Sequence, residues 1–263
     1  MPSYICTACG VEYGESERPP EVCRICEDDR RHVNRAARQW TVMGDLRREY
    51  ANTVQPDGGL TGIGTDPEFA IGQRALLVET PAGNVLWDCI SLIDSATVAA
   101  VQEHGGVRAV AISHPHFCGS MVEWSRAFGG IPVYLHASDR EWVMRHDPAI
   151  VFWSGETHGI APGLTLVRCG GHFPGSSVLH WDGGGALLAG DTLQVSPGRR
   201  RLSFMRGCPN LIPMPASEVR RIAAALEPFA FDRIYGGWWG LNVMQDAKQA
   251  LRRSVERYLA AVE

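Results

Sequence analysis

The sequence predicts an α/β fold in which two β-sheets pack face to face between outer helices, preceded by a small cysteine-rich domain. Three observations predict it. Two pairs of apolar, β-rich runs are each joined by a turn, one pair over residues 74–79 and 85–89, the other over 177–181 and 186–189. After each pair, runs of strand length alternate with segments of helical spacing, a pattern typical of helices packed on sheets. Residues 1–30 are poor in apolar side chains and hold four of the eight cysteines.

The expected strands are short, apolar and bounded by turn residues. The first hairpin turns through Pro81-Ala82-Gly83-Asn84, and the second through the Asp-Gly-Gly-Gly run at residues 182–185. The other expected strands cover residues 107–113, 132–136, 164–168 and 232–235.

The expected helices follow from apolar spacing and from a capping residue. Ser217 predicts the start of one helix as its N-cap. In residues 245–262, Ala247, Leu251 and Leu259 share a face from which Arg252 and Arg253 are absent, so that helix is amphipathic. The helices cover residues 94–103, 121–128, 217–226 and 245–262.

The chain divides into three parts. Residues 1–30 form the cysteine-rich domain, and residues 66–263 form the αββα domain. Residues 31–65 are expected to be a connector with first strands or a loop, and the run from Pro56 to Gly64 is expected to be a Gly-rich loop.

Composition excludes several classes of protein. The 263-residue chain is 45% hydrophobic and 21% charged, which suits a globular protein with a sizeable core. Its formal net charge of −4 argues against a nucleic-acid partner, which needs an excess of basic charge. No run of 18 apolar residues and no signal-peptide pattern is present, so we expect a cytoplasmic protein without a membrane partner. The expected partner is a small-molecule substrate, and homo-oligomer formation stays open.

Two C-x2-C pairs predict a structural metal site. Cys6 and Cys9 form the first pair, and Cys23 and Cys26 the second, with 13 residues between them. One tight turn can present both thiolates of a pair to one ion, so two turns complete a tetrahedral shell of four sulfurs. The region resembles a zinc ribbon or a rubredoxin-like knuckle pair. We expect zinc there, with iron as the alternative because thiolates accept either metal.

Three histidines and one aspartate that each follow a strand predict a second metal site. His114 and His116 come just past a buried strand, and their i, i+2 spacing projects them from the same side of an extended segment. His172 follows the strand at 164–168, and Asp191 follows the second hairpin. This donor set fits a catalytic metal shell.

These motifs resemble the metallo-β-lactamase-fold hydrolases over about residues 68–240. That family carries H-x-H-x-D-H after a strand, then G-H-x-P-G-S/H, G-D-x-L and a late histidine. Its early strand ends in Asp, as residues 85–88 (VLWD) do here. The resemblance implies that His114, His116 and His172 bind the first metal and that Asp191 is the carboxylate that bridges two metals. It also implies a four-layer αββα sandwich, in agreement with the paired sheets expected above.

The chain departs from the family pattern at the second metal position. Cys118 and Gly119 stand where the family has Asp and His, and residues 236–240 (GGWWG) stand where it has a late His. We therefore expect one catalytic metal, with Asp191 as its fourth ligand or as a base beside the bound water. Cys118 is a candidate catalytic residue, as a ligand, nucleophile or redox-sensitive thiol, and the alternative is a small buried filler.

The predicted function is a mononuclear metal-dependent hydrolase that directs metal-activated water at a small ester, thioester, lactone or amide. Zinc is expected in this site as well as in the ribbon, and iron is the alternative at both. Two other functions stay open. One is an iron-dependent redox or oxygen-using enzyme on the same fold, and the other is a non-catalytic scaffold whose ribbon binds a partner.

Other side chains have weaker assignments. Residues 199–201 are three arginines that either meet an anionic substrate group or form a solvated charge run. Trp238 and Trp239 either wall the pocket or belong to the core or to a dimer contact. His136 lies at the same sheet edge as the predicted site. The remaining residues of these types are expected to be buried thiols (Cys89, Cys169, Cys208) or surface and turn histidines (His104, His146, His158, His180).

Overall fold

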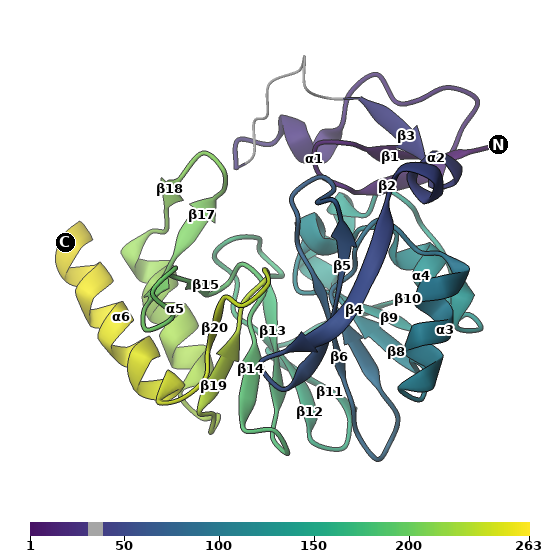
Figure 1. The fold of residues 1–263 in the computed structure, drawn as a ribbon. Coiled ribbons are helices and arrows are strands. Elements are labelled where there is room, and N and C mark those ends of the chain that lie inside the picture. Colours follow the sequence, from purple (N-terminus) through teal and green to yellow (C-terminus); the bar gives the residue numbers. More distant parts are fainter. Residues whose placement is uncertain (31–38) are drawn as a thin grey trace.

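Two β-sheets face each other at the centre of the protein, and helices cover their outer faces (Figure 1). The computed structural model describes residues 1–30 and 39–263. Within this part of the chain, the first sheet has seven strands in the order β10-β9-β8-β7-β6-β5-β4, and the second has six in the order β11-β12-β13-β14-β19-β20. The expected αββα sandwich is confirmed.

Both sheets mix antiparallel and parallel neighbours. In the first sheet, the strands from β4 to β7 pair antiparallel and those from β7 to β10 pair parallel. Its strands are β4 (Ala51–Asp57), β5 (Leu60–Asp66), β6 (Ala75–Val78), β7 (Val85–Trp87), β8 (Ala109–Ala111), β9 (Val133–His136) and β10 (Ile150–Trp153). In the second sheet β14 and β19 pair parallel, and the other neighbouring strands pair antiparallel. Its strands are β11 (Thr157–Ala161), β12 (Leu164–Arg168), β13 (Ser177–Trp181), β14 (Ala186–Leu188), β19 (Arg233–Tyr235) and β20 (Asn242–Val243).

The alternation of side chains along β6 shows how the layers are held together. Successive residues of a strand point to opposite faces of the sheet. Leu76 and Val78 pack between the two sheets, where they share one core cluster with Leu179 of β13. Ala75 and Leu77 belong to a different cluster on the outer face. Both faces of the sheet are therefore buried, which explains why the run is continuously apolar.

Helices cover the outer face of each sheet. The first sheet is covered by α3 (Ser95–Glu103) and α4 (Met121–Ala127), which contribute Val101 and Trp124 to its outer cluster. The second is covered by α5 (Ala216–Leu226) and α6 (Ala247–Val262). The prediction that Ser217 caps α5 is wrong. Pro215 holds the N-cap position, so Ser217 lies inside the first turn.

The expected Gly-rich loop before residue 65 is instead a long hairpin formed by β4 and β5. Gly58 and Gly59 have φ of 62° and 94° and make its turn. Gly62 and Gly64 lie inside β5, where an added Cβ would come within 2.4 and 2.6 Å of the Trp239 ring. These two glycines are needed for close packing against a distant tryptophan, which the local sequence does not reveal.

The N-terminal cysteine-rich segment is a small three-stranded sheet. It is formed by β1 (Ser3–Cys6), β2 (Glu12–Glu15) and β3 (Trp40–Val42), with the short helix α1 (Arg24–Glu27). Helix α2 (Met43–Glu49) follows β3 and leads into β4. This cysteine ribbon lies over the end of the first sheet (Figure 1).

Two small hairpins lie between β14 and α5. They are β15 (Gln194–Val195) with β16 (Leu202–Ser203), and β17 (Met205–Gly207) with β18 (Ile212–Pro213). Across residues 1–30 and 39–263, no helix combines the length and apolarity that a membrane span requires.

Candidate metal centres

The predicted histidine cluster assembles where strands of both sheets end. His114 follows β8, and His116 lies on the short 3-10 helix at Pro115–Phe117. His172 follows β12 of the second sheet, and Asp191 follows β14. All four side chains are buried, and their ligand atoms lie within 4.8 Å of one another. The strand ends thus bring together the four residues that were predicted from sequence.

Distances within the cluster show which atoms converge. His172 Nε2 lies 3.1 Å from His116 Nδ1. Asp191 Oδ2 lies 3.4 Å from His114 Nε2 and 3.6 Å from His172 Nε2. Three ring nitrogens and one carboxylate oxygen therefore face a common centre, which is the donor set of a metal site.

Hydrogen bonds on the far side of two rings orient them toward this centre. His172 Nδ1 lies 3.3 Å from the carbonyl oxygen of Met205. A carbonyl can only accept, so Nδ1 carries the proton and Nε2 presents its lone pair to the centre. His114 Nδ1 bonds Ser113 Oγ at 2.8 Å, and its Nε2 is buried with no hydrogen-bond partner among the described residues. Burial lowers the pKa of His172 to about 4, so its ring is neutral at pH 7. These rings fit a metal ion.

Asp88 supports the loop that carries the first two histidines. It is the last residue of the VLWD run, it is buried, and its φ is 61°. Its Oδ1 accepts a hydrogen bond of 2.7 Å from the backbone N–H of Ser113, next to His114. Burial raises the pKa of Asp88 to about 8.

Cys118 lies in the core rather than in the histidine cluster. It is 3% exposed and packs with Cys89, Ile90 and Met121 on the outer face of the first sheet. Burial raises the pKa of its thiol far above the ordinary range, which opposes the thiolate form that a ligand or nucleophile needs. This position favours the alternative that the sequence left open, a small buried filler.

A cavity of about 250 Å³ opens beside the histidine cluster and contains a cysteine that sequence reasoning missed. It is lined by Ile71, His116, Asp191, Cys208, Pro209 and Trp238. Cys208 was expected to be a buried thiol, but it is partly exposed, with Gln194 Nε2 3.0 Å from its Sγ. No local sequence pattern marks this position, which the folding of the β17–β18 region brings to the cavity. Trp238 lines the cavity, in agreement with the alternative that it walls the pocket. Trp239 packs on β5 instead.

Two other histidines have structural roles. Both ring nitrogens of His136 are engaged: Nδ1 accepts from the N–H of Ser138, and Nε2 lies 3.1 Å from the carbonyl of Gly155. His180 was expected at the surface or in a turn, but it is buried in β13 and bonds the carbonyl of Ala230.

The four ribbon cysteines form the second cluster. Their sulfurs lie within 4.8 Å of one another, with Sγ–Sγ distances of 3.6 Å for Cys9–Cys23 and 3.8 Å for Cys6–Cys26. A disulfide needs about 2 Å. With metal–sulfur bonds of about 2.3 Å, the edge of a tetrahedron is about 3.8 Å, so the observed spacing fits a metal ion. Tyr13 Oη donates to Cys23 Sγ at 3.3 Å, which stabilises a thiolate.

The cysteine ribbon contacts both loops that carry the histidines. The N–H of Glu12 donates to the carbonyl of Gly119, three residues after His116. Arg30 Nη1 donates to the carbonyl of His172 at 3.1 Å, and its guanidinium lies 3.8 Å from the centre of the Phe173 ring. The ribbon is therefore part of the support of the metal centre.

Comparison with known proteins agrees with this architecture. A profile described as the Metallo-beta-lactamase superfamily matches residues 70–238. The chain belongs to this superfamily. The matched region includes His114, His116, His172 and Asp191, and the four-cysteine ribbon lies outside it.

Similar proteins span the whole chain or its larger part. The uncharacterized protein YmaE from Bacillus subtilis (strain 168) is 44% identical over 269 residues, which cover 100% of this chain and 97% of YmaE. The solved metallo-beta-lactamase FIM-1 from Pseudomonas aeruginosa has a TM-score of 0.53 at 15% identity and covers 78% of this chain and 96% of its own. The solved metallo-beta-lactamase from Erythrobacter litoralis has a TM-score of 0.56 at 20% identity, and it covers 80% of this chain and 97% of its own. These two likenesses concern the superfamily fold alone.

Proposed function

We propose that this chain is a mononuclear metal-dependent hydrolase of small carbonyl substrates, namely esters, thioesters, lactones or amides. Superfamily membership supports a metal-dependent hydrolase. The observation that carries the single-metal assignment is the ligand set. Besides the ribbon cysteines, the described residues contain one group of three or more potential metal ligands. This group consists of His114, His116, His172 and Asp191.

The residues around the cluster suit hydrolysis by water. A metal ion held by the three histidines would lower the pKa of a bound water to about 7 and polarise a carbonyl. Asp191 faces the same centre, so its carboxylate can orient that water or take its proton. Trp238 and Pro209 give the adjacent cavity an apolar wall, and its volume of about 250 Å³ restricts it to small substrates.

Metal analysis with stoichiometry tests this proposal. We expect two metal ions per chain and, on a panel of small esters, thioesters, lactones and amides, hydrolysis of at least one class. His116→Ala should hold one metal ion and lose at least about a hundredfold in activity. His104→Ala is the control, because His104 lies at the end of α3 and pairs with Glu79.

Three results would contradict the proposal. Three metal ions per chain would show a second catalytic site, and one ion with an inert protein would favour the scaffold function. A visible absorption band with bound iron would favour redox chemistry.

A further inference from the structure

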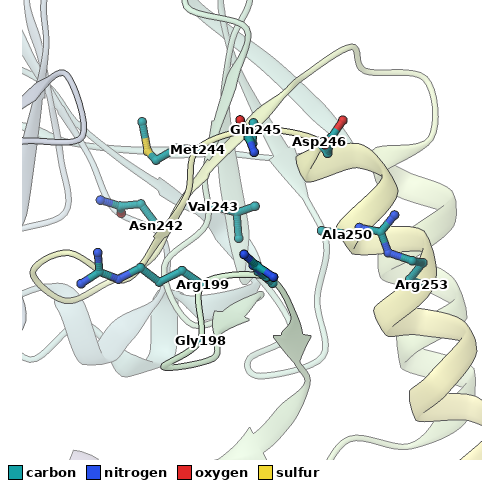
Figure 2. A pocket seen from close by; sticks show the side chains of 10 residues that line it. Gly198, Arg199, Asn242, Val243, Met244, Gln245, Asp246, Ala250 and Arg253 are labelled. Carbon is teal, nitrogen blue, oxygen red and sulfur yellow. The ribbon is translucent and has the colours of Figure 1, made fainter.

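Arginines from two elements line two adjoining cavities beside α6. The larger cavity measures about 470 Å³, and Arg199 and Arg253 extend from its opposite sides (Figure 2). Arg200 and Arg253 line both cavities, so the two adjoin. The smaller cavity, of about 300 Å³, is completed by Arg201 and Arg257. We call these five arginines the arginine cluster.

The arginine cluster concentrates positive charge on a chain whose net charge is negative. Asp246 is the one carboxylate that lines either cavity, whereas the chain as a whole has a net charge of −4. Among the described residues, none of the five guanidiniums has a carboxylate oxygen within 4.0 Å. The neighbouring Arg252 on the same helix differs, because it pairs with Glu227 at 2.6 Å. These five side chains are exposed cations that line adjoining cavities, so they repel one another, and an anionic ligand would relieve this repulsion.

The backbone holds part of this cluster in place. The loop between β15 and β16 is closed by a hydrogen bond from Ser196 N to the carbonyl of Arg201 and by another from Arg199 N to the carbonyl of Ser196. Arg199 has a φ of 54°, which costs free energy for a residue with a side chain. Arg253 comes from the second turn of the 16-residue helix α6. The two sides of the cavity therefore belong to ordered elements.

The chemistry of the walls selects the ligand. A guanidinium presents a planar fork of donors that matches two phosphate oxygens, and several such groups in one cavity match more than one phosphate. Val243, Met244 and Ala250 add apolar surface to the larger cavity, which suits an organic moiety. The volume of the larger cavity, about 470 Å³, is that of a small-molecule site.

We propose that the arginine cluster binds a small organic molecule with two or more phosphate groups, of the class of a nucleoside di- or triphosphate. This site shares no lining residue with the cavity beside the histidine cluster. The proposal therefore stands independently of the hydrolase function.

Calorimetric titration of the full metal-loaded protein with ATP, and separately with inorganic tripolyphosphate, tests the proposal at 0.15 M salt. We expect saturable binding of one ATP per chain, weaker binding of tripolyphosphate, and no binding of sulfate at the same concentration. Arg253→Gln and Arg200→Gln should each weaken ATP binding by about tenfold or more. The matched control Arg252→Gln removes the same charge from the same helix outside the cavity, and we expect a change of less than about twofold.

Three outcomes would overturn the proposal. Equal weakening by Arg252→Gln and Arg253→Gln would show nonspecific attraction to net charge. The absence of saturation at millimolar ATP, with the variants folded by circular dichroism, would show a solvated charge run. Tighter binding of a single-stranded oligonucleotide than of ATP would assign the surface to nucleic acid instead.

Discussion

At the scale of single residues, the metal centre depends on small groups that surround the ligands. Ser113 is the clearest case, because its backbone N–H bonds Asp88 while its hydroxyl bonds His114 Nδ1. Gly190 packs directly against this serine, so that the loop carrying Asp191 can approach the loop carrying His114. An added Cβ at Gly190 would lie 2.5 Å from Ser113 Oγ, and the φ of 52° there is left-handed.

We expect Gly190→Ala to lower the free energy of unfolding by about 1–3 kcal/mol, because it adds both backbone strain and a collision. It should also weaken metal binding at the histidine cluster, since Ser113 must move. Urea unfolding and metal titration measure the two effects. Gly44→Ala in α2 is the control, because nothing lies within 4 Å of its added methyl group. Equal free energies of unfolding for the two variants would show that Gly190 is not needed for this close packing.

At the scale of elements, the cysteine ribbon is joined by specific polar contacts to the part of the fold that carries the histidine cluster. Arg30 is 9% exposed, pairs with Asp28 and donates to the carbonyl of His172. A buried pair of Arg145 and Glu12 adds a second attachment, near Gly119. Since a metal in the ribbon would order the segment that leads to Arg30, the contacts of Arg30 link the two candidate metal centres.

We expect Arg30→Gln to weaken metal affinity at the histidine cluster by about tenfold while the ribbon keeps its metal, because the variant loses a support of the His172 loop. Competition with a chelator, followed by elemental analysis, measures this loss. Arg24→Gln is the matched control: Arg24 is also in the ribbon, but its pair with Glu141 is exposed. Equal chelator sensitivity of the two variants would argue against a role for Arg30 in positioning His172.

At the scale of the whole molecule, the centre lies where the two sheets meet, and each contributes ligands. Asp139, in the 3-10 helix Ala137–Trp142 after β9, joins the halves by accepting a 2.7 Å hydrogen bond from the N–H of Gly175 in the loop after β12. Its Oδ2 is buried with no hydrogen-bond partner among the described residues. Burial raises the pKa of Asp139 to about 7.

This raised pKa predicts how stability depends on pH. The folded protein holds a proton on Asp139 up to about pH 7, whereas the unfolded chain releases it near pH 4, so stability falls as pH rises between these values. The contribution is at most about 4 kcal/mol. Urea unfolding at pH 5 and pH 8 should show a smaller loss for Asp139→Asn than for the natural protein. Asp45→Asn is the control, because it removes an exposed carboxylate of α2, and its stability should change with pH like that of the natural protein. The same loss of stability between pH 5 and pH 8 in all three proteins would refute the prediction.

The parts of the site whose residues lie close together in the sequence could be predicted, and the parts that depend on distant residues could not. His114 and His116 form a local pattern after an apolar strand, and the cysteine pairs form another, so both were found. Cys208 was not, because it lies 17 residues beyond Asp191 and only the folding of the β17–β18 region brings it to the cavity. The sequence predicts a loop at Gly62 and Gly64, because the tryptophan that requires these glycines lies some 175 residues later in the chain.

The sequence by itself determined the layered α/β architecture and picked out the two groups of side chains that could hold a metal ion. These features depend on residue type and short spacing, which apolar periodicity and metal chemistry constrain locally. Only the tertiary structure decided that Cys118 faces the core, that the ribbon bonds to the His172 loop through Arg30, and that distant arginines gather beside α6. Such contacts join residues far apart in the chain, and they follow from how sheets and helices pack rather than from any local pattern.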